Sequence, residues 1–450
     1  MDPSPTVGKV PATAPPPRIE YPGPPLLEPR PPDPVPSRPA PPARFRFGAL
    51  RHRNYRLFIS GQFISLAGSW MQSVAQGWLV LQLTNSPFQV GLVTTMGTLP
   101  ILLFTLPGGV IADRVDKRRV VFLLQALMLV DALALGVLTA TGRVTVGWVM
   151  ALAVFNGILT AFEVPARQAF VIDLVAREDL TSAIALNASA FNVTRVIGPS
   201  VAGVLISTVG IAACFFVNAV SYVAVLAGLT MLQLPPHRPG RRGGGGWSAL
   251  AEGTRYIQET PWPRALILLT ATYSIFGYAV LPMLSVFARD ALGAGAGGYG
   301  FLVASVGVGA AAGSLFLAAV ETETRRRPLL FAGGILFGAL IVLAAVSRTY
   351  PVATAWMALT GLAMILTNVS VNTLLQTEAP DALRGRVMGF YSFVVLGMAP
   401  FGAFQMGWLA DHLGIRAAFA IGGAACIAVS VLVAWRMRRT PTPTLVPEAG

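Results

Sequence analysis

Apolar runs about as long as a bilayer is thick recur along this sequence, and they constrain its fold more than any other feature. A helix needs roughly 20 predominantly apolar residues to cross the hydrocarbon core. The chain of 450 residues is 54% hydrophobic and only 12% charged, about half the charged fraction of a soluble domain. It is therefore predicted to be an all-α membrane protein with twelve transmembrane helices in two six-helix bundles. The expected spans are 57–82, 88–111, 119–140, 145–167, 183–207, 211–232, 264–288, 299–320, 328–347, 351–375, 386–410 and 415–435.

The distribution of Lys and Arg predicts how these spans are oriented. If the N-terminus is inside, nearly all basic residues close to the spans lie on the inner side. The outer turns hold only Arg143, Arg289, Arg348 and Arg416. By the positive-inside rule, both termini are expected in the cytoplasm, with the protein in the cytoplasmic membrane of a bacterium. The net charge of +13 thus reflects the orientation of the chain in the lipid bilayer, and no nucleic-acid partner is expected.

A proline-rich tail and a polar linker divide the chain. Nearly half of the 35 prolines precede residue 46, in a stretch that lacks periodic apolar residues and cannot bury a core. The linker after the sixth span contains PPHRPGRRGGGGW and an amphipathic segment. The expected divisions are a disordered cytoplasmic tail 1–45, a first bundle 46–232, a cytoplasmic linker 233–262, a second bundle 263–436 and a cytoplasmic tail 437–450.

The two halves also repeat each other at a constant offset. GIAACF at 210–215 and GIRAAF at 414–419 each open the last span of their half, and the same offset aligns Gly157 with Gly361. A parallel duplication of six spans implies two bundles related by an axis normal to the membrane, with a cavity between them. This is the architecture of a carrier that exposes one central site to each side in turn.

The segment GGVIADRVDKRR, residues 108–119, joins the second and third spans. It resembles the signature of the major facilitator superfamily, which has a Gly, three residues, Asp-Arg and then a basic cluster. Asp116 stands where the family usually has Gly, and the second-half loop keeps Gly313 but lacks the matching Asp. The resemblance covers about residues 48–436 and implies the major facilitator fold and a transport function.

The charges of this loop favour a latch that closes a cytoplasmic gate. Gly109 has no side chain and allows another helix to approach closely. Asp113 would meet the positive start of the eleventh helix. There its carboxylate could pair with Arg384 or Arg386, holding the inside closed when the carrier opens outward.

Two further basic residues extend the predicted latch. Arg114 and Arg118 could reach Glu163 at the cytoplasmic end of the fourth helix. Glu163 could instead pair with Arg167, which lies one helical turn further on. For the other two basic residues of the loop, the positive-inside rule is a sufficient explanation.

The stretch 163–203 carries a narrower resemblance. PARQAF, LVAREDL and RVIGPSVAG are similar to the branch of the superfamily that includes enterobactin-exporter-like and macrolide-efflux-like carriers. GPSVAG also resembles the fifth-helix motif of the family's exporters, with Ala202 in place of a glycine. Pro199 removes a backbone donor and bends the helix, while Gly198 and Gly203 allow tight packing, expected against the eighth span.

Two ionisable residues lie near the middle of spans, where a charge costs about 2.5–3.5 kcal/mol on insertion scales. Asp131 is in the third span and Arg195 is in the fifth, at similar depths, so they could form a buried ion pair. One interpretation is that Asp131 binds a coupling proton while Arg195 modulates its pKa. The alternative is a static pair that fixes helix packing.

Polar and aromatic residues at midspan are candidates for the substrate cavity. Their mixture of amides and phenols favours a large amphipathic substrate over a sugar or a small ion. Any of them could instead serve packing between helices. The candidates are Gln62, Gln72, Gln76, Asn192, Tyr273, Tyr278, Asn368, Asn372 and Tyr391.

The motifs of enzymes and ATP-driven pumps are absent from the sequence. The three histidines form no H-E-x-x-H arrangement, and no G-x-x-x-x-G-K-[ST] loop occurs. No enzyme activity, metal or cofactor is therefore expected, and a proton gradient would supply the energy. We expect a monomeric, proton-coupled exporter of amphipathic small molecules such as drugs or siderophores. The alternatives are an importer of the same fold and a membrane sensor or scaffold that transports nothing.

Overall fold

The computed structural model describes residues 48–112, 115–233, 254–319 and 326–439. These residues are almost entirely helical, and none of them lies in a strand. This agrees with the apolar runs of the sequence, because an α-helix satisfies every backbone hydrogen bond within its own segment inside a bilayer. The described residues belong to one compact unit.

Six long helices make up the first half of the chain. Three of them contain proline in the interior: Pro100 and Pro107 in the second, Pro165 in the fourth and Pro199 in the fifth. The helices are α1 (Arg53–Thr84), α2 (Pro87–Ala112), α3 (Lys117–Ala140), α4 (Val146–Asp173), α5 (Leu180–Thr208) and α6 (Ile211–Thr230), with short 3-10 turns η1 (Gly48–Arg51) and η2 (Arg177–Asp179).

The second half begins with a broken span. The predicted run 264–288 is not one α-helix, because Pro282 lies within a turn and two stretches widen to π-helix geometry. Its pieces are α8 (Pro261–Thr272), η3 (Tyr273–Gly277), η4 (Tyr278–Val280), α9 (Leu284–Val286) and η5 (Phe287–Ala291). The remaining helices are α10 (Ala296–Ala319), α11 (Arg326–Val346), α12 (Tyr350–Glu378), α13 (Asp381–Gly397), α14 (Ala399–Leu413) and α15 (Ile415–Arg439).

Eleven helical segments of the described residues are long and apolar enough to cross a membrane. The pieces from α8 to η5 count as one of these segments, and so do α13 and α14 together. The helix α1 is not among them, although it has 32 residues. Gln62, Gln72 and Gln76 lower its mean hydropathy, and it lies against α5 and α6. With α1, the helices account for the twelve predicted spans.

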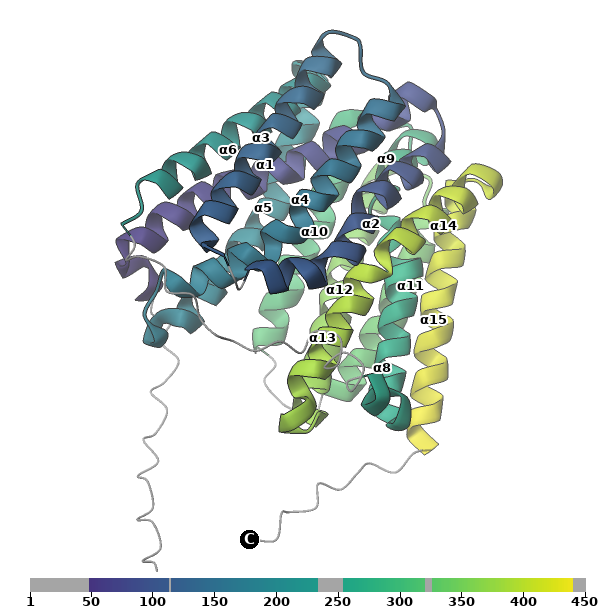
Figure 1. Cartoon of the computed structure of the whole chain (residues 1–450). Coiled ribbons are helices and arrows are strands. Elements are labelled where there is room, and N and C mark those ends of the chain that lie inside the picture. Colours follow the sequence, from purple (N-terminus) through teal and green to yellow (C-terminus); the bar gives the residue numbers. More distant parts are fainter. Residues whose placement is uncertain (1–47, 113–114, 234–253, 320–325, 440–450) are drawn as a thin grey trace, which may run out of the picture. The chain divides into compact units, whose positions relative to one another are not determined.

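Helix pairs at equivalent places in the two halves use glycine in the same way. A Cβ atom at Gly157 of α4 would collide with the carbonyl oxygen of Gly97 in α2. A Cβ atom at Gly361 of α12 would likewise collide with the carbonyl oxygen of Val306 in α10. Because of these close approaches, α2 packs on α4 and α10 packs on α12 (Figure 1).

The two halves meet along two helix pairs, α5 with α10 and α2 with α14. Glycines again set the spacing. Gly203 of α5 faces Gly300 of α10, and Gly91 of α2 faces Gly407 of α14. A side chain at any of these positions would meet backbone atoms of the opposite half within about 3 Å.

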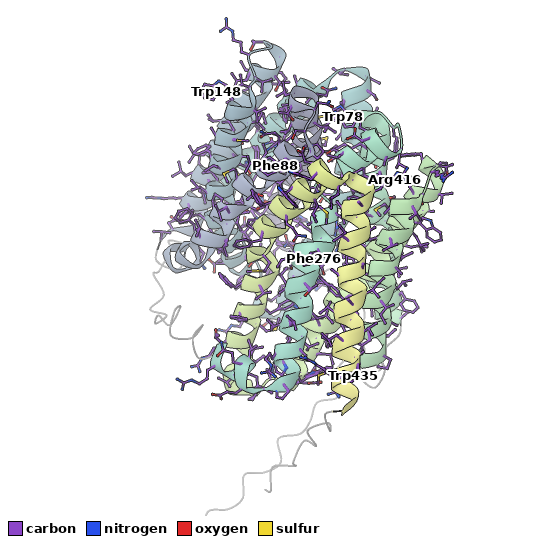
Figure 2. The ribbon with its side chains drawn as sticks, turned by 90° about the vertical axis from the view of Figure 1, so that its right-hand side faces the viewer. Trp78, Phe88, Trp148, Phe276, Arg416 and Trp435 are labelled. Carbon is purple, nitrogen blue, oxygen red and sulfur yellow. The ribbon has the colours of Figure 1, made fainter. Side chains whose placement is uncertain are left out.

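These contacts lie toward one end of the helices. We call it the closed end, and it carries the connections 85–86, 209–210, 292–295 and 414. Trp78, Phe88 and Arg416 lie toward this end in Figure 2, whereas Trp435 lies toward the opposite end, which we call the basic end. The basic end carries most of the Lys and Arg residues from which the sequence predicts the cytoplasmic side.

Candidate transport site

A cavity of about 400 Å³ lies between the two halves of the chain. Its volume falls in the range of small-molecule sites, roughly 300–1,000 Å³. The first half contributes residues of α1, α2, α4 and α5, and the second half contributes α10 and the turn at Leu281 and Pro282. The wall is mostly apolar, and its polar and aromatic members are Trp70, Ser73, Gln76, Thr94, Thr98, Asn156, Thr160, Arg195 and Tyr299.

Arg195 extends from the middle of α5 into this wall. Its guanidinium carbon lies 5.9 Å from the centre of the Trp70 ring, in a cation–π arrangement. One guanidinium nitrogen lies 3.9 Å from the sulfur of Met364, which belongs to α12 of the other half. None of the ion pairs among the described residues includes Arg195.

Asp131 lies behind the cavity wall and does not pair with Arg195 in the described part of the chain. Its side chain is 1% exposed, and its Oδ2 accepts a hydrogen bond of 3.1 Å from Nδ2 of Asn156. Gln72 of α1 lies beside the same carboxyl group. Since Asn156 lines the cavity, a single amide separates Asp131 from the space between the halves. The sequence left open whether Asp131 pairs with Arg195, and in the described residues its carboxyl group is instead hydrogen-bonded to the amide of Asn156.

A second buried carboxyl group, that of Glu163, lies closer to the basic end. Its Oε1 accepts hydrogen bonds from Nε of Arg167 at 2.8 Å and from Nε2 of Gln125 at 3.0 Å. Of the two pairings considered for Glu163, the structure shows the one with Arg167, one helical turn further on. Arg118 does not reach it. That side chain donates instead to the carbonyl oxygens of Leu229 and of the next residue, at the end of α6, because these last carbonyls lack helical partners.

Three of the predicted cavity residues meet in the second half. Nδ2 of Asn368 lies 3.3 Å from the hydroxyl of Tyr278, and Oδ1 of Asn368 accepts a 3.3 Å hydrogen bond from the hydroxyl of Tyr391. They come from the broken seventh span, α12 and α13. Tyr273 lies elsewhere. Its hydroxyl is 2.6 Å from that of Ser430 in α15, so it joins helices within the half.

The other cavity candidates take different places. Gln76 lines the cavity, whereas Gln62 is buried inside the first half and does not. Gln72 accepts a 2.6 Å hydrogen bond from Asn218 of α6. Asn192 donates a hydrogen bond to a carbonyl of its own helix, and Asn372 accepts one from the next turn of α12. Neither residue lines the cavity.

The predicted cytoplasmic latch is only partly covered by the described residues. Asp113 and Arg114 lie outside them, and Gly109 lies in the last turn of α2. Arg384 donates a 2.8 Å hydrogen bond to the carbonyl oxygen of Gln376 near the end of α12. Arg386 follows it in the first half of α13. The latch therefore stays a prediction.

The glycines of the Gly-Pro motif contact two different helices. Gly203 lies against Gly297 and Gly300 of α10, which is the eighth span. Gly198 lies instead against Trp70 of α1, within its own half. Pro199 is buried between them in α5. The motif thus packs α5 on a helix of each half, rather than on the eighth span alone.

Charged side chains of the second half cap helix ends of the first half at the closed end. Oδ1 of Asp411 accepts hydrogen bonds from Oγ of Ser86 at 2.9 Å and from the backbone N–H of Phe88 at 3.3 Å, at the start of α2. Arg289 donates a 3.3 Å hydrogen bond to the carbonyl oxygen of Leu81, near the end of α1. Each charge has the sign that the helix end favours.

Rings close the same end of the interface between the halves. Trp78 of α1 stacks on Tyr299 of α10, with ring centres 5.9 Å apart. Phe88 of α2 meets Phe404 of α14 edge to face at 5.5 Å. Further toward the basic end, a Cβ atom at Gly385 or Gly389 of α13 would meet nothing within 4 Å. The halves are therefore in contact at the closed end and along the middle of the cavity.

The sequence interpretation missed several residues of the cavity wall, among them Trp70, Tyr299 and Asn156, and for Asn156 the sequence held a signal. The signal was present in the helix boundaries. Asp131 lies nine residues before the end of α3 at Ala140, and Asn156 lies ten residues after the start of α4 at Val146. Consecutive antiparallel helices place such residues at equal depth, so the boundaries indicate the depth that the two residues share but not that they face each other. Within the described residues, no group of three His, Cys, Asp or Glu could hold a metal ion.

Comparison with known proteins places this architecture among membrane exporters. A family model described as transmembrane secretion effector matches residues 45–447. The staphyloferrin A transporter of Staphylococcus aureus is 24% identical over 384 residues, covering 84% of this chain and 94% of that protein. The multidrug efflux pump Tap of Mycolicibacterium fortuitum is 27% identical over 365 residues, covering 78% and 88%. The enterobactin exporter EntS of Shigella flexneri is 25% identical over 397 residues, covering 87% and 94%.

Solved structures share the fold at low sequence identity. A bacterial homologue of the human lysosomal transporter Spinster, in an inward-facing and unoccupied conformation, superposes with a TM-score of 0.66 at 14% identity. That match covers 86% of this chain and 95% of the homologue. The nucleoside transporter NupG superposes with a TM-score of 0.68 at 12% identity, covering 85% and 99%. The helices described above thus form the major facilitator fold.

Proposed function

Because this chain belongs to the transmembrane secretion effector family of the major facilitator superfamily, we propose that it exports amphipathic small molecules in exchange for protons. It is a multi-pass membrane transporter and not an enzyme. Its relatives named for efflux or export, a multidrug pump and an enterobactin exporter, support the direction of transport. Exchange with protons is the part of the proposal that rests on the chain's own residues.

The observation that carries the proposal is a carboxyl group one amide away from a cavity that both halves enclose. Within the described residues Asp131 forms no ion pair, and it accepts its hydrogen bond from Asn156, which lines the cavity. A charged carboxylate at this depth is costly without a partner, so a proton taken up and released there would couple to changes in the cavity. Each conformation must expose the site to one side, with proton and substrate preferring different conformations.

The charge distribution supports an orientation for the two ends. With both termini in the cytoplasm, the basic end faces the cytoplasm and the closed end faces outward. Asp411, Arg289 and Trp78 then close the outer side. This would be the inward-facing state, which takes substrate from the cytoplasm. The cytoplasmic latch of Asp113 with Arg384 or Arg386 would form in the opposite state.

The test is efflux in energised inverted vesicles, with a cationic dye, an anionic dye, a macrolide and a catechol siderophore supplied in turn. Wild type is expected to accumulate at least one compound inside inverted vesicles, and a protonophore should abolish this accumulation. Asp131→Asn is expected to lose the gradient-driven accumulation while still exchanging labelled for unlabelled compound. Glu178→Gln, which removes an exposed carboxylate in the 3-10 turn η2, is the matched control and should behave as wild type.

Three results would contradict the proposal. Uptake by intact cells from the medium, without accumulation in inverted vesicles, would assign an importer. Accumulation that requires sodium and survives a protonophore would assign a different coupling ion. Normal gradient-driven accumulation by Asp131→Asn would make Asp131 a structural residue, and the coupling group would then lie elsewhere.

A further inference from the structure

The cavity wall has one charge and no charged partner for it. Of the described residues that line the cavity, Arg195 alone is ionised at neutral pH, and none is Asp or Glu. Its contacts are a tryptophan face and a methionine sulfur. Neither of these can neutralise a guanidinium. The carboxyl group of Asp131 accepts a hydrogen bond from Asn156 and forms no ion pair with Arg195.

A lone guanidinium at this depth in a membrane protein calls for an anion. Intramembrane arginines are costly and are almost always paired or placed in a pathway. The planar fork of Arg matches a carboxylate, sulfonate or phosphate with two parallel hydrogen bonds. We propose that Arg195 is the recognition residue for an anionic group of the transported molecule. This inference rests on the proposed transport function and names its substrate class, an amphipathic organic anion.

The rest of the wall fits the remainder of such a molecule. Trp70 lies directly beside the guanidinium, and Tyr299 offers a second aromatic face toward the closed end. Gln76 and Asn156 supply amide groups for hydrogen bonds. An aromatic or otherwise apolar body with one acidic group would satisfy both kinds of wall. A permanent cation would meet Arg195 with no carboxylate in the wall to offset the repulsion.

Charge also limits how exchange can work with such a substrate. A proton and an anion attract each other, so they would not displace one another from the cavity by repulsion. Exchange must then come from the two conformations, each preferring one of the two bound species. Binding of the anion and coupling to protons are therefore separable properties, and they can be measured separately.

The test measures binding without any gradient. Purified protein in discs of zwitterionic lipid is titrated into fluorescein, an anion, and into rhodamine 123, a cation built on the same xanthene frame, with empty discs as the blank. Fluorescence polarisation gives both affinities. Wild type should bind fluorescein more tightly than rhodamine 123. Arg195→Gln should weaken fluorescein binding by about 10- to 100-fold, the usual value of a hydrogen bond to a charged group, while Arg195→Lys keeps part of it.

Two further variants keep the test informative if Arg195→Gln does not fold. Arg143→Gln removes an arginine from the exposed turn between α3 and α4, which does not line the cavity, and should leave both affinities unchanged. Gln76→Glu keeps Arg195 and adds a negative charge to the same wall. It should weaken fluorescein and strengthen rhodamine 123, even if Arg195→Gln fails to fold.

Several outcomes would overturn the inference. These are wild type that binds rhodamine 123 more tightly than fluorescein, wild type that binds no fluorescein, or equal fluorescein affinity in wild type and Arg195→Gln. Loss of dye binding in discs of phosphatidylglycerol would assign the anion to a lipid headgroup instead of a substrate. If fluorescein binds through Arg195 but energised vesicles move nothing, the anion site stands and the exporter proposal fails.

Discussion

The two halves of the chain share a fold but bury different polar groups. In the described residues, the only buried carboxyl groups are those of Asp131 and Glu163, and both belong to the first half. The second half buries phenols and hydroxyls, and its half-buried Tyr278 and Asn368 form a hydrogen-bonded chain with the buried Tyr391. Groups of the second kind exchange hydrogen bonds but stay neutral at physiological pH. The duplication therefore conserves helix packing while ionisable chemistry is confined to one half.

This difference suggests a division of labour between the halves. The first half would carry the proton and the charge that recognises substrate, since Asp131 and Arg195 both lie there. The second half would shape the cavity wall and move against the first half as a body of fixed hydrogen bonds. Removing a buried carboxyl group from the first half should therefore have a larger effect than removing a neutral polar group from the second half.

The largest expected effect separates Asp131 from Tyr278. Asp131→Asn should abolish protonophore-sensitive efflux, because it removes the group that titrates. Tyr278→Phe should lower the efflux rate by no more than about tenfold, the equivalent of one neutral hydrogen bond. Initial rates in inverted vesicles measure both. A Tyr278→Phe variant that also loses proton coupling would contradict the assignment of the ionisable chemistry to the first half.

A large effect on stability is expected at the other buried carboxyl. Glu163→Ala leaves the partly buried Arg167 without its partner at 2.8 Å, which should reduce the free energy of unfolding by about 3–5 kcal/mol. The double variant Glu163→Leu with Arg167→Leu should recover most of this loss. Unfolding in mixed detergent micelles measures the two values. If the double variant is as unstable as the single one, the charge pair is not the cause.

A smaller effect is expected at a buried contact of the second half. Tyr273→Phe removes a hydrogen bond of 2.6 Å to Ser430 between η3 and α15. It should lower the free energy of unfolding by about 1 kcal/mol, because Ser430 still donates to the carbonyl oxygen of Cys426. The same unfolding assay applies, with Ser430→Ala as the matched partner. A loss as large as that of Glu163→Ala would remove the contrast in energy between the halves.

The smallest expected effect concerns the second half's carboxylate at the interface. Asp411 is exposed and caps the start of α2 across the closed end. Asp411→Asn should destabilise the closed end by about 0.3–1 kcal/mol, the usual value of a charge at a helix terminus. Spin labels on Thr84 and Leu413 would report a modest gain in the population with a longer distance. An unchanged distance distribution would show that the cap does not hold this end.

The sequence predicts the architecture well because hydropathy and charge act over whole helices. The apolar runs predict twelve spans. The close helix packing at Gly157 recurs at Gly361, at the offset by which the two halves repeat. The break of the seventh span at Pro282 was not predicted, because its apolar run is continuous and only packing shows where the helix unwinds. Hydropathy averages over a window and cannot register a local change of helix type.

The partners of the buried ionisable groups were harder to predict. Helix α3 is apolar on most sides, so no amphipathic stripe indicates which way Asp131 points. Depth alone favoured Arg195, whereas the structure gives Asn156 of the neighbouring helix. For Glu163 the partner lies one turn away on the same helix, where spacing determines contact. Contacts within a helix are thus predictable from sequence, and contacts between apolar helices are not.

The low hydropathy of α1 bears on how the protein enters the membrane during synthesis. Among the long helices of the described residues, the first to be synthesised, α1, is long enough to cross a membrane but falls short of the mean hydropathy that defines a span. Its glutamines become buried only against later helices, as when Gln72 meets Asn218 of α6. At about 5–20 residues per second, those helices follow on the order of ten seconds later. Until then α1 would need shelter at the insertion machinery, so the residues that serve the finished carrier make its first step of biogenesis the most dependent on assistance.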